Sequence, residues 1–292
     1  MPTERDQSAD PIPAKLKAGI KLGHYNILSR LGTGGMGEVW LAEDSRLGRK
    51  VAVKPLLGKF ASDPERLRRF ETEARAASAT NHPNIVTIFE IGNSNGISFI
   101  AQEFVDGETL RNRLARGPIP LIEALDISYQ VANALATAHG AGIIHRDIKP
   151  ENIMLAPRQG DTDFVKILDF GLAKLVQPDI DAQRTTMGMT YGDPRYMAPE
   201  QARGEVVDRR GDIYSLGALG FEMLVGEPPF KGGGTFEVLQ KVLDAPVPRV
   251  RERRSDCPPW LESIVRTALG GRDSAERTAF SLIRKNRARS LT

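Results

Sequence analysis

The chain has 292 residues, of which 40% are hydrophobic and 26% charged, the mixture of an ordinary globular protein. Its formal net charge of +3 is too small to argue for nucleic-acid binding, and no nucleic-acid partner is expected. The single cysteine, Cys257, excludes an internal disulfide and favours a reducing compartment, so we expect a cytoplasmic location. No apolar run reaches about 18 residues, which predicts no membrane span in this chain.

The first third of the chain has the pattern of short strands. Residues 1–22 are polar and contain proline, which predicts a flexible tail and neither a signal peptide nor an anchor. A glycine-rich turn separates two strand-like runs and predicts a hairpin. The predicted strands are Tyr25–Leu28, Glu38–Ala42, Val51–Lys54, Ile85–Glu90 and Ser98–Phe104, with a turn at Asn93–Gly96. The apolar spacing of Pro64–Thr80 predicts a helix among these strands.

From about residue 108 the pattern becomes helical. The segment Ile213–Val225 is apolar almost all round, as a buried central helix would be. The other predicted helices are Leu121–Ala141, Thr235–Leu243 and Trp260–Leu269. The last residues, 284–292, are basic and predict the frayed end of a final helix.

Short motifs in one order along the chain can together hold and cleave ATP. Phosphoryl transfer needs positioning and charge neutralisation more than covalent chemistry. The motifs are GTGGMG at 32–37, VAVK ending at Lys54, a lone glutamate at Glu73, HRDIKPEN at 145–152, DFG at 169–171 and APE at 198–200. Their order and spacing resemble the protein kinase superfamily over roughly residues 25–280. Their wording is most similar to the bacterial eukaryotic-like Ser/Thr protein kinases.

The resemblance implies an α+β fold with two lobes. Residues 25–105 would form the N-lobe, a small antiparallel β-sheet with helix αC, and would end at the start of the hinge. Residues 106–283 would form a larger, mainly helical C-lobe. We therefore expect the chemistry to lie between a sheet lobe and a helical lobe.

The resemblance also assigns the nucleotide contacts. Glycines let the backbone approach a triphosphate without Cβ clashes. A lone GxGxxG also marks dinucleotide-binding folds, but here a strand follows the motif where those folds have a helix. The implied ATP-binding residues are Leu31, Gly32, Thr33, Gly34, Gly35, Met36, Gly37, Val39, Ala52, Lys54, Glu103, Val105 and Met154. Among these, Glu103 and Val105 belong to the hinge, and Gln102 before them takes the gatekeeper position.

The implied catalytic residues are Lys54, Glu73, Asp147, Lys149 and Asn152. Lys54 would bind the α- and β-phosphates and pair with Glu73, although Glu71 is a rival two positions away. Asp147 would orient the substrate hydroxyl and Lys149 would contact the γ-phosphate. Asn152 and Asp169 would hold Mg²⁺, or Mn²⁺ in its place. His145 is implied to be structural, near Phe170, and Asp212 is implied to brace the catalytic-loop backbone.

Regulation is implied by the pair Arg146–Asp147, which in many kinases accompanies a phosphorylated activation loop. Thr185, Thr186 and Thr190 are the candidate phosphosites. We expect protein substrates with Ser or Thr, and a homodimer for autophosphorylation in trans. Glu200 is implied to pair with Arg277.

One position departs from the family's pattern: Asp193 stands where a threonine usually bonds the residues matching Asp147 and Lys149. An aspartate could pair with Lys149, but its charge would also lie near Asp147 and disfavour the ionised carboxylate there. Two alternatives therefore stay open beside a protein Ser/Thr kinase. They are a pseudokinase scaffold that binds nucleotide and partners, and a kinase that acts on small molecules.

Overall fold

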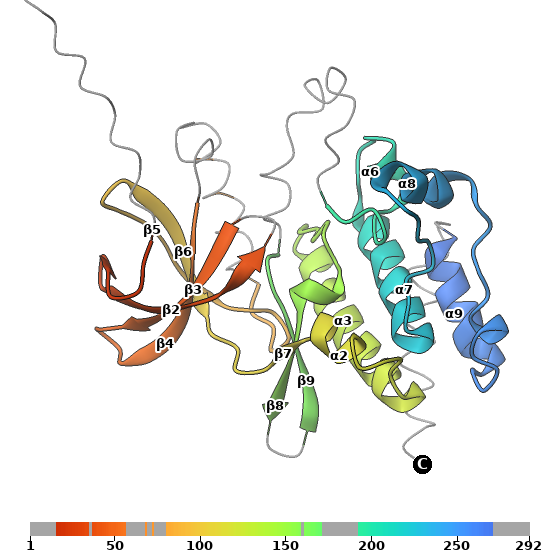
Figure 1. Ribbon diagram of the computed structural model, residues 1–292, viewed down its shortest axis with the longest axis horizontal. Coiled ribbons are helices and arrows are strands. Elements are labelled where there is room, and N and C mark those ends of the chain that lie inside the picture. The colour runs from red at the N-terminus through yellow and green to blue at the C-terminus, as the bar shows by residue number, and fades with distance from the viewer. Residues whose placement is uncertain are drawn as a thin grey trace, which may run out of the picture. The chain divides into compact units, whose positions relative to one another are not determined.

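The computed structural model describes residues 16–34, 37–56, 68, 72, 80–158, 161–170 and 192–270. Contacts divide the chain into two compact units (Figure 1). The first comprises the described residues within Met1–Glu71 together with Ile88–Phe104, and the second those within Thr72–Thr87 and Val105–Thr292. Among the described residues, none of the helices combines the length and the apolar character that a membrane crossing requires.

The first unit is a six-stranded antiparallel sheet with the strand order β1-β2-β3-β4-β6-β5. Its strands are β1 (Lys21–Leu22), β2 (Tyr25–Gly34), β3 (Gly37–Asp44), β4 (Arg49–Pro55), β5 (Ile88–Ser94) and β6 (Ile97–Glu103). Neighbours in sequence are mostly neighbours in the sheet, because tight hairpins connect antiparallel strands. The predicted helix Pro64–Thr80, with Glu71 and Glu73, falls outside the described residues except for Arg68 and Thr72, which are helical.

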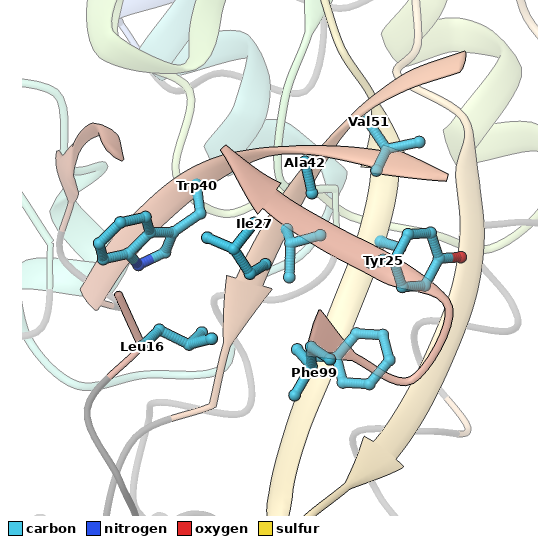
Figure 2. Packing of buried hydrophobic residues seen from close by; sticks show 10 residues of the cluster. Leu16, Tyr25, Ile27, Trp40, Ala42, Val51 and Phe99 are labelled. Atoms are coloured by element: carbon cyan, nitrogen blue, oxygen red, sulfur yellow. The ribbon is translucent and has the colours of Figure 1, made fainter. Parts of the chain in front are cut away.

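The core of this unit lies on one face of the sheet. Alternate residues of a strand point to opposite faces, so the cluster draws every second residue from β2, β3, β4 and β6. Figure 2 shows the cluster, in which the ring of Tyr25 lies edge-on to that of Phe99 with centroids 5.7 Å apart. The buried members are Leu16, Leu22, Tyr25, Ile27, Trp40, Ala42, Val51, Val53, Phe99 and Ala101.

The fourth predicted strand is displaced: Ile85–Glu90 was expected, and the strand runs over Ile88–Ser94. The reason is that the residues before Ile88 belong to the second unit and pair with its strand β9 (Asp161–Ile167). Asn84 donates its side-chain amide to the carbonyl of Val165 over 2.7 Å, and Val86 donates its N–H to Ile167 over 3.0 Å. The predicted turn also shortens to Asn95 and Gly96, whose φ angles of 53° and 74° suit a two-residue hairpin.

The second unit is mainly helical. It contains α2 (Leu110–Leu114), α3 (Leu121–Gly140), α6 (Pro199–Ala202), α7 (Arg209–Val225), α8 (Thr235–Asp244) and α9 (Pro259–Leu269). A small sheet in the order β7-β8-β9 lies beside them, built from β7 (Glu108–Thr109), β8 (Ile153–Arg158) and β9 (Asp161–Ile167). Two 3₁₀ turns, η2 (Pro150–Asn152) and η3 (Val250–Glu252), complete the described elements. Three of the four predicted helices of this region are confirmed to within one residue at each end, whereas α7 begins at Arg209, four residues before the predicted Ile213, because Asp208 caps it there.

Helix α7 is the centre of the second unit. Every residue from Gly211 to Leu224 is buried, and the helix packs between α3 and α9 (Figure 1). Its N-terminus is capped by Asp208, whose carboxylate accepts the N–H of Arg210, and it ends at Gly226, which is left-handed with φ 87°. A helix buried on all sides is a fixed scaffold, so polar side chains that leave it are held in place.

Gly107, just before β7, offers a test of the packing around the small sheet. A Cβ added at Gly107 would lie 2.2 Å from the backbone oxygen of Leu155 on β8, so the β7–β8 pairing must shift. We expect Gly107→Ala to lower the free energy of unfolding by about 1–3 kcal/mol. The matched control is Gly140→Ala, where a Cβ meets nothing within 4 Å and no loss is expected. Urea unfolding measures both, and equal stability of the two variants would contradict the predicted clash.

Candidate active site

Three predicted nucleotide contacts share one face of the six-stranded sheet. Trp40 and Val53 are cross-strand partners on the core face, which places Val39, Ala52 and Lys54 on the opposite face. Ala52 is 6% exposed and lies opposite Gln102 on β6, itself 3% exposed. The cation that ends the apolar run of β4 therefore stands on the same side as the small residue predicted to cover adenine.

The glycine-rich motif closes the hairpin between β2 and β3. Gly32 pairs with Val39, Thr33 with Glu38, and Gly34 with Gly37; Gly35 and Met36 lie outside the described residues. Gly37 has φ 117°, a conformation that only glycine adopts without strain. Leu31, just before the motif, keeps 46% of its surface exposed.

The predicted hinge begins where β6 ends. Glu103 is the last residue of β6 and pairs with Val51, and the chain passes from the first unit to the second between Phe104 and Val105. Met154, the remaining predicted adenine contact, belongs to the second unit and lies on β8 opposite Thr109 and Lys166.

The second unit brings together three predicted catalytic side chains. Lys149 donates its ammonium group to Oδ2 of Asp147 over 2.6 Å. Asn152 donates its amide nitrogen to the same oxygen over 3.0 Å and to the backbone carbonyl of Asp147 over 2.8 Å. Asp147 is thus fixed by a cation and an amide, and its side chain is 23% exposed. A carboxylate held in this way can accept a hydrogen bond from an incoming hydroxyl.

The β8–β9 hairpin explains why Asn152 and Asp169 lie at the same end of one element. Ile153 pairs with Ile167, and the N–H of Leu168 donates to the carbonyl of Asn152 over 2.9 Å. Asp169 then has φ 60°, a left-handed conformation that costs a non-glycine residue ~1–3 kcal/mol. Asn152 and Asp169 are 17 positions apart in the sequence, and the pairing of β8 with β9 brings both to the same end of the hairpin.

His145 has a structural role. Its Nε2 lies 2.8 Å from the carbonyl oxygen of Leu168, which can only accept, so Nε2 carries the proton. Its Nδ1 then accepts the N–H of Asp147 over 3.2 Å. The ring is fully buried and lies edge-on to Phe170 with centroids 4.6 Å apart. Both ring nitrogens are used, so the prediction that this histidine transfers no proton to substrate is supported by its geometry.

Asp212 holds the loop that carries these groups. It is fully buried in the first turn of α7. Its carboxylate accepts the N–H of His145 over 2.8 Å, the N–H of Arg146 over 2.7 Å and Nε2 of His139 over 2.8 Å. Arg146 has φ 66°, so the loop is strained at the residue whose N–H the carboxylate accepts. The predicted brace is confirmed.

A family model described as the protein kinase domain matches residues 25–286, nearly the whole chain. The chain belongs to the protein kinase family. It is 42% identical over 260 residues to the serine/threonine-protein kinase PknA of Mycobacterium tuberculosis, and 44% identical over 251 residues to PknB of Mycolicibacterium smegmatis. These matches cover 87% and 84% of this chain, and 58% and 39% of the relatives.

A crystal structure of the Mycobacterium tuberculosis PknI kinase domain has a TM-score of 0.71 to this chain, at 28% sequence identity. The match covers 94% of this chain and all of that domain. The predicted fold is therefore confirmed, and the chain is a bacterial eukaryotic-like Ser/Thr protein kinase catalytic domain. It spans about half the length of the curated relatives it matches.

The kinase residues present suit a magnesium ion. Asn152 uses its amide nitrogen on Asp147, which leaves its amide oxygen as the atom to face a cation. Asp169 adds a carboxylate, and both are the hard oxygen donors that Mg²⁺ prefers. Among the residues that the structure describes, no cluster of three or more His, Cys, Asp or Glu could hold a metal alone.

The expectation that Asp193 could pair with Lys149 is wrong. Asp193 binds Arg195 instead, with Nε at 2.8 Å and 3.1 Å from its two oxygens and Nη2 closing the bidentate pair. Burial would raise the pKa of Asp193, but the hydrogen bonds and charge of Arg195, with the charge of Lys149, hold that pKa below its usual range. The extra carboxylate is neutralised by a neighbour two residues away.

The regulatory predictions fall largely outside the described residues, which exclude Thr185, Thr186, Thr190 and Arg277. The receiving arginine is described. The Nε of Arg146 is buried without a hydrogen-bond partner among the described residues. A buried donor without an acceptor is costly, and an anion would satisfy it.

Sequence reasoning missed a partly buried polar network beneath the site. Arg111 of α2 donates to Glu151 and to Glu222, both over 2.7 Å, and to the hydroxyl of Tyr196 over 2.6 Å. Tyr196 in turn donates to Glu222 on α7. Arg111 is followed closely by Arg113 and Arg116, so no local pattern singles it out. The network fixes the segment before APE to the same helix that carries Asp212.

The brace can be tested by removing its charge. In Asp212→Asn the amide nitrogen must face N–H donors, and one backbone donor is left without an acceptor. We expect the free energy of unfolding to fall by about 2–4 kcal/mol and kcat/KM to fall about a hundredfold. Urea unfolding and steady-state kinetics measure these changes. Asp244→Asn, at the exposed end of α8, is the control; a brace variant that behaves like this control would refute the role.

Proposed function

We propose that this chain transfers the γ-phosphoryl group of ATP to serine or threonine hydroxyls of protein substrates, in signal transduction. The observation that carries the proposal is the cluster of Asp147, Lys149 and Asn152, held by a loop that Asp212 braces. This arrangement supplies a fixed acceptor for the hydroxyl proton and a cation beside it. Family membership and the kinase relatives at about 40% identity support the same conclusion.

Each residue then has a role. The backbone of Gly32–Gly37 cradles the triphosphate, and Lys54 neutralises the α- and β-phosphates. Leu31, Val39, Ala52 and Met154 contact adenine, and Glu103 and Val105 bind its edge. Asn152 and Asp169 hold Mg²⁺, or Mn²⁺, which when bound neutralises charge that develops on the phosphates. Asp147 orients the hydroxyl, and Lys149 beside it contacts the γ-phosphate. Glu73 pairs with Lys54.

The alternative of a pseudokinase scaffold is not supported. It depended on Asp193 disturbing Asp147 and Lys149, but Lys149 keeps its bond to Asp147 while Asp193 binds Arg195. The curated relatives PknA and PknB are named serine/threonine-protein kinases, which also disfavours small-molecule substrates. Because the reaction consumes ATP, we place this domain in the cytoplasm; fractionation of cells that express the native protein checks the location.

The metal and phosphate assignments predict two inactive but folded variants. Asp169→Asn removes the charged metal ligand, and Lys54→Met removes the phosphate cation, while neither deletes core packing. We expect both to lose phosphoryl transfer by at least about a thousandfold, with melting temperatures close to that of the wild type. Lys50→Met, an exposed lysine on the same strand, is the control. Wild-type turnover in either site variant, with unchanged melting, would refute that assignment.

The proposed switch is autophosphorylation of Thr185 or Thr186, with Thr190 as a further phosphosite, in trans within a homodimer. A phosphothreonine carries nearly two negative charges and would pair with the guanidinium of Arg146. The variant Thr185→Ala/Thr186→Ala should gain fewer phosphates by intact mass after ATP and Mg²⁺, and should lose most of its rate on an added peptide. Thr137→Ala on α3 is the control. Full activity of the double variant would show that the loop needs no phosphate.

A further inference from the structure

Asp193 and Arg195 form an ion pair beside the catalytic aspartate, Asp147. The carboxylate of Asp193 accepts the backbone N–H of Arg195 over 3.1 Å as well as its guanidinium. The side chain of Asp193 is 19% exposed and that of Arg195 is 37% exposed. Since the pair is partly shielded from water, the loss of one charge would leave the other poorly solvated.

The local turn explains part of this geometry. Pro194 occupies the second position of a turn in which the N–H of Tyr196 donates to the carbonyl of Asp193 over 3.1 Å. An aspartate at the first position commonly accepts the N–H two residues on. Formation of the turn, however, requires only one carboxylate oxygen to accept that N–H. It does not explain why the guanidinium of Arg195 binds both oxygens.

The position of the turn supplies the reason. A Cβ built on Gly192 would lie 3.8 Å from Oδ1 of Asp147, so the turn runs directly past the catalytic carboxylate. Lys149 is near enough for its charge to lower the pKa of Asp193. The turn cannot retreat, because Tyr196 is buried and its carbonyl accepts the hydroxyl of Ser215 on α7 over 2.8 Å.

The carboxylates of Asp147 and Asp193 therefore both lie near the ammonium group of Lys149. Lys149 now donates to Asp147 over 2.6 Å, and Asp193 is saturated by Arg195. Without the guanidinium, the fixed carboxylate of Asp193 would attract the ammonium group of Lys149, whose long stem can reorient. The lysine would then leave Asp147, which would lose its cationic partner and keep only the amide of Asn152.

We infer that Arg195 is a positioning residue of the kinase site: it neutralises Asp193 so that Lys149 stays on Asp147. The inference rests on the proposed kinase function. It makes Asp193 and Arg195 interdependent, so that the aspartate is tolerated at the family's threonine position only because the arginine accompanies it.

A double-mutant cycle tests this dependence. Arg195→Ala leaves Asp193 charged and alone, and we expect kcat on one peptide to fall about tenfold or more with the KM for ATP changed less than about twofold. Asp193→Asn/Arg195→Ala removes both charges while the asparagine oxygen still accepts the turn N–H, and we expect at least half of wild-type kcat to return. Arg195→Lys keeps the charge without the bidentate geometry and should retain an intermediate rate.

Controls separate this role from stability. Arg210 binds Asp208 with the same two-residue spacing at the start of α7, so Arg210→Ala loses a matched ion pair away from Asp147. We expect it to keep wild-type kcat, and all variants are compared by melting temperature. If the wild type is active and Arg195→Ala matches it, or the double variant stays as slow as Arg195→Ala, the inference is wrong. A wild type that transfers no phosphate would overturn the proposed function, and this inference with it.

Discussion

The buried carboxylate of Asp212 is the constraint on which the rest of the site depends. It lies in the first turn of α7 and accepts three hydrogen bonds, two of them from the backbone of the catalytic loop. A buried charge is tolerated only when such donors surround it. Because α7 is buried along nearly its whole length, the carboxylate cannot move, and the strained loop at Arg146 is held against it. The positions of Asp147 and Asn152 follow from that anchor.

A second set of buried polar contacts extends the same scaffold to the segment before APE. Glu222, nearer the C-terminal end of α7, binds Arg111 and Tyr196. Gln201 donates its side-chain amide to the carbonyl of Arg146 over 2.9 Å. The loop and the segment 192–200 are thus mounted on one helix. Networks of this kind are stable only when each member is satisfied, so the loss of one partner is felt at several positions. This arrangement explains why the short turn Asp193–Tyr196 can set the charge beside Asp147.

The pair Asp193–Arg195 shows how a single charge can mislead when it is considered alone. An aspartate in place of threonine suggests a damaged site, because like charges near Asp147 oppose its ionisation. The neighbouring guanidinium reverses that conclusion, since a bidentate pair consumes both oxygens of the carboxylate. The departure from the family's pattern therefore involves two residues, and its effect on Lys149 depends on both.

The sequence by itself determined the fold class, the four longer helices of the second unit and the motifs, because these are local patterns of spacing and residue type. It could not place β5, since hydrogen bonds from Asn84 and Val86 to strand β9, about 80 residues away in the chain, decide where that strand begins. It also could not identify Arg111 or the partner of Asp193, because side-chain pairing depends on which backbones approach one another. Only the tertiary structure decided these contacts, since the free energy of burying a charge is fixed by neighbours that no local pattern reveals.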